Sequence, residues 1–172
     1  MHHLHLLRHA KSDQDAGVED HERPLSRSGR ETARRVGEGL PAALGTLDLV
    51  LCSTALRTRQ TAALALSGFA VPPPILYEDA LYLAGSAALL RRLRRLAEDA
   101  GTVLLIGHNP GLRELAITLA SPDSPRHRAL ASGKFPTSAR ASLAIQSPWA
   151  TLDRTRHKLV AYVTPKSLGK ED

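Results

Sequence analysis

Arginine and histidine side chains occupy three similar places in the sequence, each at the end of an apolar run or just inside the helix that follows. Arg8 and His9 end the first run, Arg57 lies in the first turn of an expected helix, and His108 follows a third run. Guanidinium groups bind phosphate through paired hydrogen bonds, and a neutral imidazole is a competent nucleophile near pH 7. Two arginines and two histidines with no carboxylate between them therefore indicate a pocket for a doubly charged oxyanion, and phosphate fits it best.

The elements that would position these side chains follow from hydrophobic periodicity. Short runs rich in Leu and Val have the length of buried strands, and longer segments repeat apolar residues at helical spacing. We expect strands at residues 4–9, 47–52, 102–107, 137–145 and 157–164. We expect helices at residues 29–44, 56–64 and 86–99, whereas residues 75–83 are ambiguous. This order predicts an α/β fold, a single-domain three-layer sandwich whose mostly parallel central sheet is flanked by helices.

The carboxyl ends of parallel strands meet at one edge of such a sheet, and ligands bind at that edge. Arg8, His9 and His108 would lie at strand ends on this edge, and Arg57 would lie in a helix that starts there. A helix N-terminus favours an anion, so Arg57 adds a guanidinium to a place that already suits phosphate. We therefore expect the four side chains to converge on one site.

Local signals predict where three helices begin. Ser28 and Glu31 have the spacing of a capping box for the helix at residues 29–44. The segment Ser53-Thr54 offers caps for the next helix. After His108, Asn109 is the expected N-cap and Pro110 the first helical residue.

The length of 172 residues predicts one domain, which we place at residues 1–165, followed by a C-terminal tail at residues 166–172. The hydrophobic content of 42% and the charged content of 23% are typical of a globular protein. Residues 121–136 are polar and rich in Pro, Ser and Arg. A loop of this length is often functional, and it is long enough to act as a lid over the site.

The net charge of +6 raises the question of a nucleic-acid partner. In residues 89–97 the arginines alternate with leucines at helical spacing, which is typical of a solvated helix face. Aromatic residues make up only 3% of the chain, too few for a surface on which bases stack. We therefore expect no nucleic-acid partner.

The sequence lacks signals for membranes or secretion. No apolar run approaches the roughly 20 residues of a membrane span, and Met1-His2-His3 does not begin a secretory signal. The single Cys52 cannot form an internal disulfide, which fits a reducing compartment. We expect a cytoplasmic protein with no membrane association.

Other phosphate and metal chemistries fail on spacing. A cysteine phosphatase loop needs five residues between Cys and Arg, but Arg57 follows Cys52 after four residues and Arg59 follows it after six. Gly133-Lys134 is not followed by the hydroxyl residue of a Walker loop. The histidine cluster at residues 2–5 has no matching Cys or His pair for zinc. We expect neither a metal nor another cofactor.

Four segments together resemble the histidine phosphatase superfamily, whose fold is phosphoglycerate mutase-like. They are Leu6–Ser12, Arg23–Gly29, Cys52–Thr61 and Gly107–Pro110, and they follow one another in the order of the family. Lys134–Thr137 resembles a later segment of the family. Within the superfamily, the chain is most similar to the small phosphohistidine phosphatases of the SixA type.

The resemblance implies a role for each of the converging residues. His9 matches the nucleophile that becomes transiently phosphorylated, and Arg8 and Arg57 match the arginines that bind phosphate. His108 matches the second histidine, which contacts the phosphoryl oxygens and stabilises the transition state. Water would then hydrolyse the phosphoenzyme without a metal.

One departure from the family pattern bears on the substrate. Mutases and many ester phosphatases of the family carry an acidic proton donor where this sequence has Leu83, although Glu78 and Asp79 lie nearby. An alkoxide leaving group needs that proton, worth ~10²–10⁴-fold in rate, whereas the imidazole of phosphohistidine needs it much less. We therefore expect hydrolysis of phosphohistidine on a protein. A phosphatase of a small phosphomonoester and a non-catalytic phosphate or nucleic-acid binding module stay open as alternatives.

Overall fold

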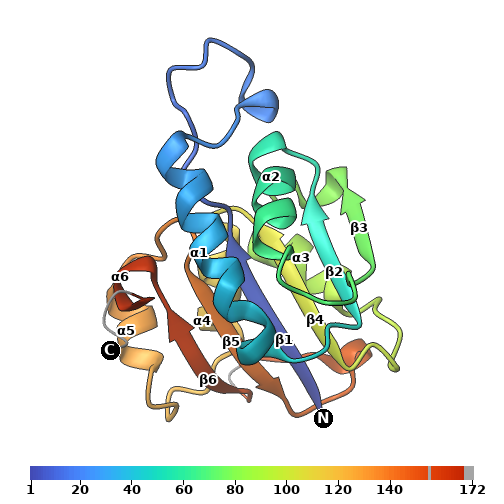
Figure 1. Ribbon diagram of the computed structural model, residues 1–172. Helices are drawn as coiled ribbons and strands as arrows, with labels where there is room; N and C mark the ends of the chain where they lie inside the picture. The colour runs from blue at the N-terminus through green and yellow to red at the C-terminus, as the bar shows by residue number, and fades with distance from the viewer. Residues whose placement is uncertain (155, 169–172) are drawn as a thin grey trace.

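The computed structural model describes residues 1–154 and 156–168 (Figure 1). The strands are β1 (His2–Arg8), β2 (Leu49–Ser53), β3 (Ile75–Glu78), β4 (Thr102–Gly107), β5 (Arg140–Ile145) and β6 (Lys158–Val163). The α-helices are α1 (Arg27–Leu44), α2 (Leu56–Ala65), α3 (Ser86–Leu93), α4 (Gly111–Leu119), α5 (His127–Ser132) and α6 (Pro165–Leu168). Short 3₁₀ helices are η1 (Asp20–Glu22), η2 (Asp79–Leu81) and η3 (Trp149–Thr151).

All strands belong to one six-stranded sheet in the order β3-β2-β4-β1-β5-β6. β1, β2, β3 and β4 run in the same direction, whereas β5 is antiparallel to both of its neighbours. The predicted α/β fold with a mostly parallel sheet is therefore confirmed. The late strands, which the sequence places at residues 137–145 and 157–164, pair with each other and also extend the sheet.

Both faces of the sheet are buried, which explains the nearly continuous apolar runs of its central strands. Leu7 in β1 packs with α1 and α2 on one face, whereas Leu6 packs with α3 and α4 on the other. The same alternation holds in β4, since successive side chains of a strand point to opposite faces. Figure 1 shows the resulting three layers, with α1 and α2 in front of the sheet.

Helix α1 begins two residues earlier than the expected capping box. Its N-cap is Ser26, whose hydroxyl accepts a hydrogen bond from the Gly29 backbone N–H at 3.0 Å, so the prediction of Ser28 was wrong. The physical reason lies in the segment after β1. The Ser26 N–H donates to the Lys11 carbonyl, and Gly29 lies so close to that carbonyl that a Cβ there would collide with it.

The other two cap predictions were also wrong, because tertiary contacts hold the expected side chains. Helix α2 has Ala55 as its N-cap, while the Thr54 hydroxyl donates to Asp79. Helix α4 has Pro110 as its N-cap, because the Asn109 side chain instead donates to the Phe135 carbonyl at 2.7 Å.

Several element boundaries also differ from the expected ones. Helix α3 ends at Leu93, six residues before the predicted end at residue 99. Leu96 lies beyond the helix but packs into the same core, which is why the apolar pattern continues past Leu93. Residues 75–83 form β3 and η2, and residues 121–136 contain α5. Of the expected tail, residues 166–168 lie in α6 and residues 169–172 lie outside the described residues.

In the ranges that the structure describes, no helix is both long and apolar enough to cross a membrane.

Candidate active site

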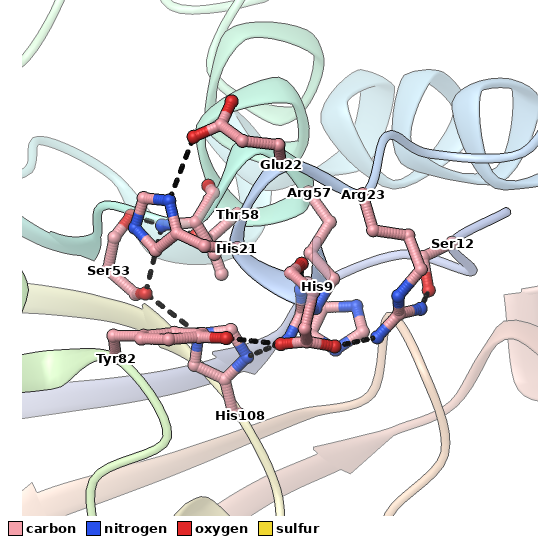
Figure 2. A network of polar contacts seen from close by, with 12 residues as sticks. His9, Ser12, His21, Glu22, Arg23, Ser53, Arg57, Thr58, Tyr82 and His108 are labelled. Carbon is pink, nitrogen blue, oxygen red and sulfur yellow. Dashed lines mark hydrogen bonds and ion pairs between the residues drawn. The ribbon is translucent and has the colours of Figure 1, made fainter. Parts of the chain in front are cut away.

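Strand register brings the predicted residues to one edge of the sheet. Arg8 is the register partner of Gly107, so His9 and His108 leave adjacent strands at the same level. Ser53 ends β2 next to them, and Arg57 lies in the first turn of α2. The rings of His9 and His108 have their centroids 5.4 Å apart, and Arg57 Nη2 lies 3.5 Å from His108 Nδ1 (Figure 2).

His9 is held in one tautomer by the backbone. Its Nδ1 lies 2.7 Å from the Ala10 carbonyl oxygen, which can only accept a hydrogen bond. Nδ1 therefore carries the ring proton, and Nε2 of the neutral ring keeps a free electron pair. Burial lowers the pKa of His9 to about 4, and the cations Arg8 and Arg57 also lower it. The ring is consequently neutral at pH 7.

His108 has the opposite tautomer. Its Nδ1 faces Arg57 Nη2, a group that can only donate, so the ring proton is on Nε2 and is donated to Ser53 Oγ at 2.7 Å. Burial first, then the neighbouring His9 and Arg57, lower the pKa of His108 to about 3. Both histidines of the site are therefore neutral at pH 7.

Arg57 is buried, and the loop that carries η1 holds its guanidinium. Nη1 donates to the Asp20 carbonyl at 2.7 Å, and Nη2 lies 3.1 Å from the Asp20 carboxylate. That carboxylate also accepts hydrogen bonds from the Tyr82 hydroxyl and, at 2.9 Å, from Arg23. These hydrogen bonds hold the pKa of Asp20 well below its usual range, and the bond from Tyr82 has the largest effect. Asp20 is therefore ionised and cannot donate a proton near pH 7.

Arg8 reaches the site from the end of β1. Its Nη1 donates to the Phe135 carbonyl at 3.1 Å, and its buried Nε has no hydrogen-bond partner in the described part of the chain. Burial lowers the pKa of Arg8, as does the charge of Arg57. Two guanidinium groups thus approach each other here, an arrangement that an anion between them would stabilise.

Aromatic rings form one wall of the site. Tyr82 packs edge-on against His108, with ring centroids 5.5 Å apart, and the Arg57 guanidinium lies 5.9 Å from the Tyr82 ring centre. His21 packs edge-on against the other side of Tyr82 at 4.8 Å (Figure 2). The sequence interpretation missed Asp20, His21 and Tyr82. The arginine motif that begins at Arg23 lies just after Asp20, and this proximity is the one sequence signal that could have found it.

Glu78 and Asp79 do not join the site. Both oxygens of Glu78 accept hydrogen bonds from Arg92, at 2.7 and 2.9 Å, and this pairing lowers the pKa of Glu78. Asp79 accepts a hydrogen bond from the Thr54 hydroxyl at 2.6 Å. Leu83, which stands where the family carries an acid, has a half-exposed apolar side chain and a positive φ of 51°.

The described residues do not form a metal site of the usual kind. Within residues 1–154 and 156–168, no three His, Cys, Asp or Glu side chains gather in a way that could hold a metal ion. Of the N-terminal histidines, His2 stacks on Trp149 and His5 bonds to Ser142, and both belong to β1.

Comparisons with known proteins identify the family of this chain. Residues 4–81 match a family model described as the histidine phosphatase superfamily (branch 1). An uncharacterized protein of Mycobacterium tuberculosis is 39% identical over 163 residues, covering 93% of this chain and 100% of the relative.

Two solved structures cover nearly the whole chain. The structure of a candidate phosphohistidine phosphatase SixA from Nakamurella multipartitia is 32% identical, with a TM-score of 0.83 over 95% of this chain and 96% of that one. A SixA candidate from Agrobacterium tumefaciens is 30% identical, with a TM-score of 0.81 over 95% and 98%. The protein belongs to the histidine phosphatase superfamily and is similar to its SixA-type members.

Proposed function

We propose that this protein is a phosphatase that removes the phosphoryl group from phosphohistidine on a protein. In the first step, Nε2 of His9 attacks phosphorus and the bond from phosphorus to the substrate imidazole breaks. In the second step, water attacks the phosphorylated His9, inorganic phosphate leaves, and the ring nitrogen recovers its electron pair. No metal takes part in either step.

The tautomer of His9 supports its role as the nucleophile. The hydrogen bond from Nδ1 to the Ala10 carbonyl leaves Nε2 unprotonated, and the pKa of about 4 keeps it so at neutral pH. A neutral nucleophile needs no general base, because there is no proton to remove before attack. The same hydrogen bond fixes the ring orientation, which reduces the entropy lost in reaching the reactive geometry.

The cations supply the electrostatic part of catalysis. Arg8 and Arg57 each keep a buried Nε without a partner in the described part of the chain, so both have donors to offer. Fixed donors in a site shielded from water stabilise the negative charge on the transferring group without reorganising. In this proposal, His108 changes tautomer when phosphate displaces Arg57 from it: Nδ1 then carries the ring proton and donates it to a phosphoryl oxygen, while Nε2 accepts from the Ser53 hydroxyl, which holds the ring in place.

The observation that carries the proposal is that Glu78, Asp79 and Asp20, the carboxylates nearest to the expected donor position or to the arginines, are each held by other groups. Glu78 is bound by Arg92, Asp79 accepts from Thr54, and Asp20 is ionised among its donors. An alkoxide would therefore leave without a proton, which costs roughly 10²–10⁴-fold in rate. A phosphohistidine ring that carries a proton on its other nitrogen leaves as neutral imidazole, so it needs no acid from the protein.

Transfer between two imidazoles also suits the site thermodynamically. The bond that forms on His9 is of the same phosphorus–nitrogen type as the bond that breaks in the substrate. The first step is therefore close to balanced in free energy, and the fixed cations have only to lower its barrier.

Trapping of the intermediate tests the proposal. Mixing the protein with a peptide that carries radiolabelled phosphohistidine, in the presence of chelator, and quenching in base within milliseconds should leave label on His9. The label should be stable in base and lost in acid. The His9→Ala variant should take up none, whereas Arg91→Met, which removes an exposed cation of α3, should match the wild type. Label on another residue, or none in the wild type while phosphate is released, would overturn the assignment.

A further inference from the structure

A second basic cavity adjoins the site and is not used by the chemistry above. It has a volume of about 670 Å³ and lies between the end of β1, the start of α4 and the segment at residues 133–137. Its lining includes four cationic side chains, Arg8, Lys11, Arg113 and Lys134, and no carboxylate. Arg8 therefore belongs to both the phosphate site and this cavity, so that a ligand in one is next to the other.

Among the described residues, the cations of the cavity have no acidic partners. None of the four lies within ion-pair distance of a carboxylate in residues 1–154 and 156–168. Arg113 donates to the Ala131 carbonyl at 2.8 Å, but its buried Nε has no partner in the described ranges. Four like charges that face one cavity repel one another, and an anion in the cavity would relieve that repulsion.

The part of the wall formed by Lys134 and Phe135 is held in place by contacts within the protein. The Phe135 carbonyl accepts from both Arg8 and Asn109, and the Phe135 ring is buried and stacked on Tyr162. The Tyr162 hydroxyl donates to the Lys134 carbonyl at 2.6 Å. Since binding pays little to order a wall that is already fixed, the cavity is preorganised for a ligand.

The lining also indicates the kind of ligand. Pro136 and the stems of the lysines and arginines give mostly apolar walls below charged ends. Such a cavity suits an acidic group carried on an apolar stem. It is far larger than the single phosphoryl group that the neighbouring site would take.

We propose that this cavity binds a second anionic group of the substrate, so that the enzyme prefers phosphohistidine with an acidic side chain nearby. The inference rests on the proposed phosphatase activity, because it assigns the cavity to the same substrate. Acidic side chains and the second phosphate of a small molecule share the required chemistry, and the experiment below separates these two sources.

The primary test compares two phosphohistidine peptides that differ only in Glu against Gln beside the phosphorylated residue. We expect the wild type to have a KM about five- to tenfold lower for the Glu peptide, with similar kcat. Lys134 is exposed, so Lys134→Glu should fold normally and remove this preference. The matched control, Arg91→Glu, changes the net charge equally on the exposed face of α3 and should keep the preference. Equal KM values for both peptides in the wild type would overturn the inference.

Two further arms separate the possible outcomes. The first arm compares inhibition by pyrophosphate and by phosphate when the two peptides have equal KM values. If pyrophosphate then inhibits far more strongly and Lys134→Glu removes that difference, the second anion is a phosphate and the assignment to an acidic side chain is wrong. If neither phosphohistidine peptide is hydrolysed, the proposed function fails. The cavity is then tested by measuring the binding of phosphoserine peptides that carry Glu or Gln beside the phosphorylated residue. Tighter binding of the Glu peptide that is lost in Lys134→Glu would still support the anion-binding role of the cavity. Equal affinities for the two peptides would contradict that role.

Discussion

The carboxylate of Asp20 lies 3.1 Å from Nη2 of Arg57, the same nitrogen that faces His108. A carboxylate and a phosphoryl group are both strong partners for a guanidinium, so Asp20 competes with phosphate for Arg57. We predict that Asp20→Asn, which keeps the shape and the backbone carbonyl bonded to Arg57, lowers the inhibition constant of inorganic phosphate about three- to tenfold.

Steady-state inhibition by phosphate would measure this effect, with Asp15→Asn, an exposed acid of the same loop, as the control. An unchanged or raised inhibition constant in Asp20→Asn would mean that Asp20 holds Arg57 ready for phosphate rather than competing with it.

The pH dependence of activity should reflect the lowered pKa of His9. The neutral ring is the reactive form, and its pKa of about 4 means that protonation begins only well below neutrality. We predict that kcat/KM, which reports the free enzyme, stays level from pH 8 to about 5.5 and falls toward pH 4. The ionisation of the substrate phosphoryl group must be measured separately and divided out. A decline with a midpoint near 6.5, the ordinary value for histidine, would contradict the buried environment of the nucleophile.

The part of the site that the sequence predicted lies on regular elements. Arg8, His9 and His108 follow buried strands whose apolar runs fix both the register and the end of each strand. The position of Arg57 in the site follows in the same way from the predicted start of α2. Their convergence is a geometric consequence of a parallel sheet, and periodicity alone is enough to anticipate it.

The part that the sequence did not predict depends on contacts between distant segments. Asp20 meets Arg57 across 37 residues of chain, and Tyr82 meets Asp20 across 62. Both come from irregular segments, in which no periodicity reports which way a side chain points. The misplaced start of α1 has the same origin, because the Lys11 carbonyl rather than the local Ser-x-x-Glu spacing decides where the helix begins.

Stability should fall in acid because His5, His9, His108 and His157 are buried and burial lowers the pKa of each. The pKa values of His5, His9 and His108 are lowered to about 3, about 4 and about 3. The unfolded chain takes up protons at these residues below about pH 6.5, whereas the folded protein does not. Their stabilising contribution is therefore complete above pH 6.5 and is lost as pH falls toward 4.

We predict that near pH 5 these residues make the free energy of unfolding fall by about 4 kcal/mol per pH unit, at about 1.4 kcal/mol for each histidine. Denaturant unfolding at several pH values would measure the slope. His5→Leu should reduce the measured slope by about 1.4 kcal/mol per pH unit, since Ser142 keeps its hydrogen bond from Arg140 in that variant. An unchanged slope in His5→Leu would show that His5 is not kept neutral by burial.

Two glycines of α1 should respond oppositely to the same substitution. A Cβ on Gly29 would collide with the Lys11 carbonyl, whereas a Cβ on Gly39 would meet open space. We predict that Gly29→Ala destabilises the protein by about 3 kcal/mol and lowers kcat/KM roughly tenfold or more, because it displaces the segment that follows His9. Gly39→Ala should instead stabilise it by about 0.5–1 kcal/mol, with unchanged activity. Thermal unfolding and kinetics on both variants would check this, and similar effects at the two positions would refute the close approach.

The central claim is that the site transfers phosphate from a leaving group that needs no acid. Its most direct test is the rate of phosphate release from a phosphohistidine peptide and from a simple alkyl phosphate, with wild type and His9→Ala in parallel and chelator present. We predict that the wild type hydrolyses the phosphohistidine peptide at least about 10²-fold faster than the alkyl ester, and that His9→Ala hydrolyses neither. Equal or faster cleavage of the alkyl ester by the wild type would contradict the claim, because it would require a proton donor in the site.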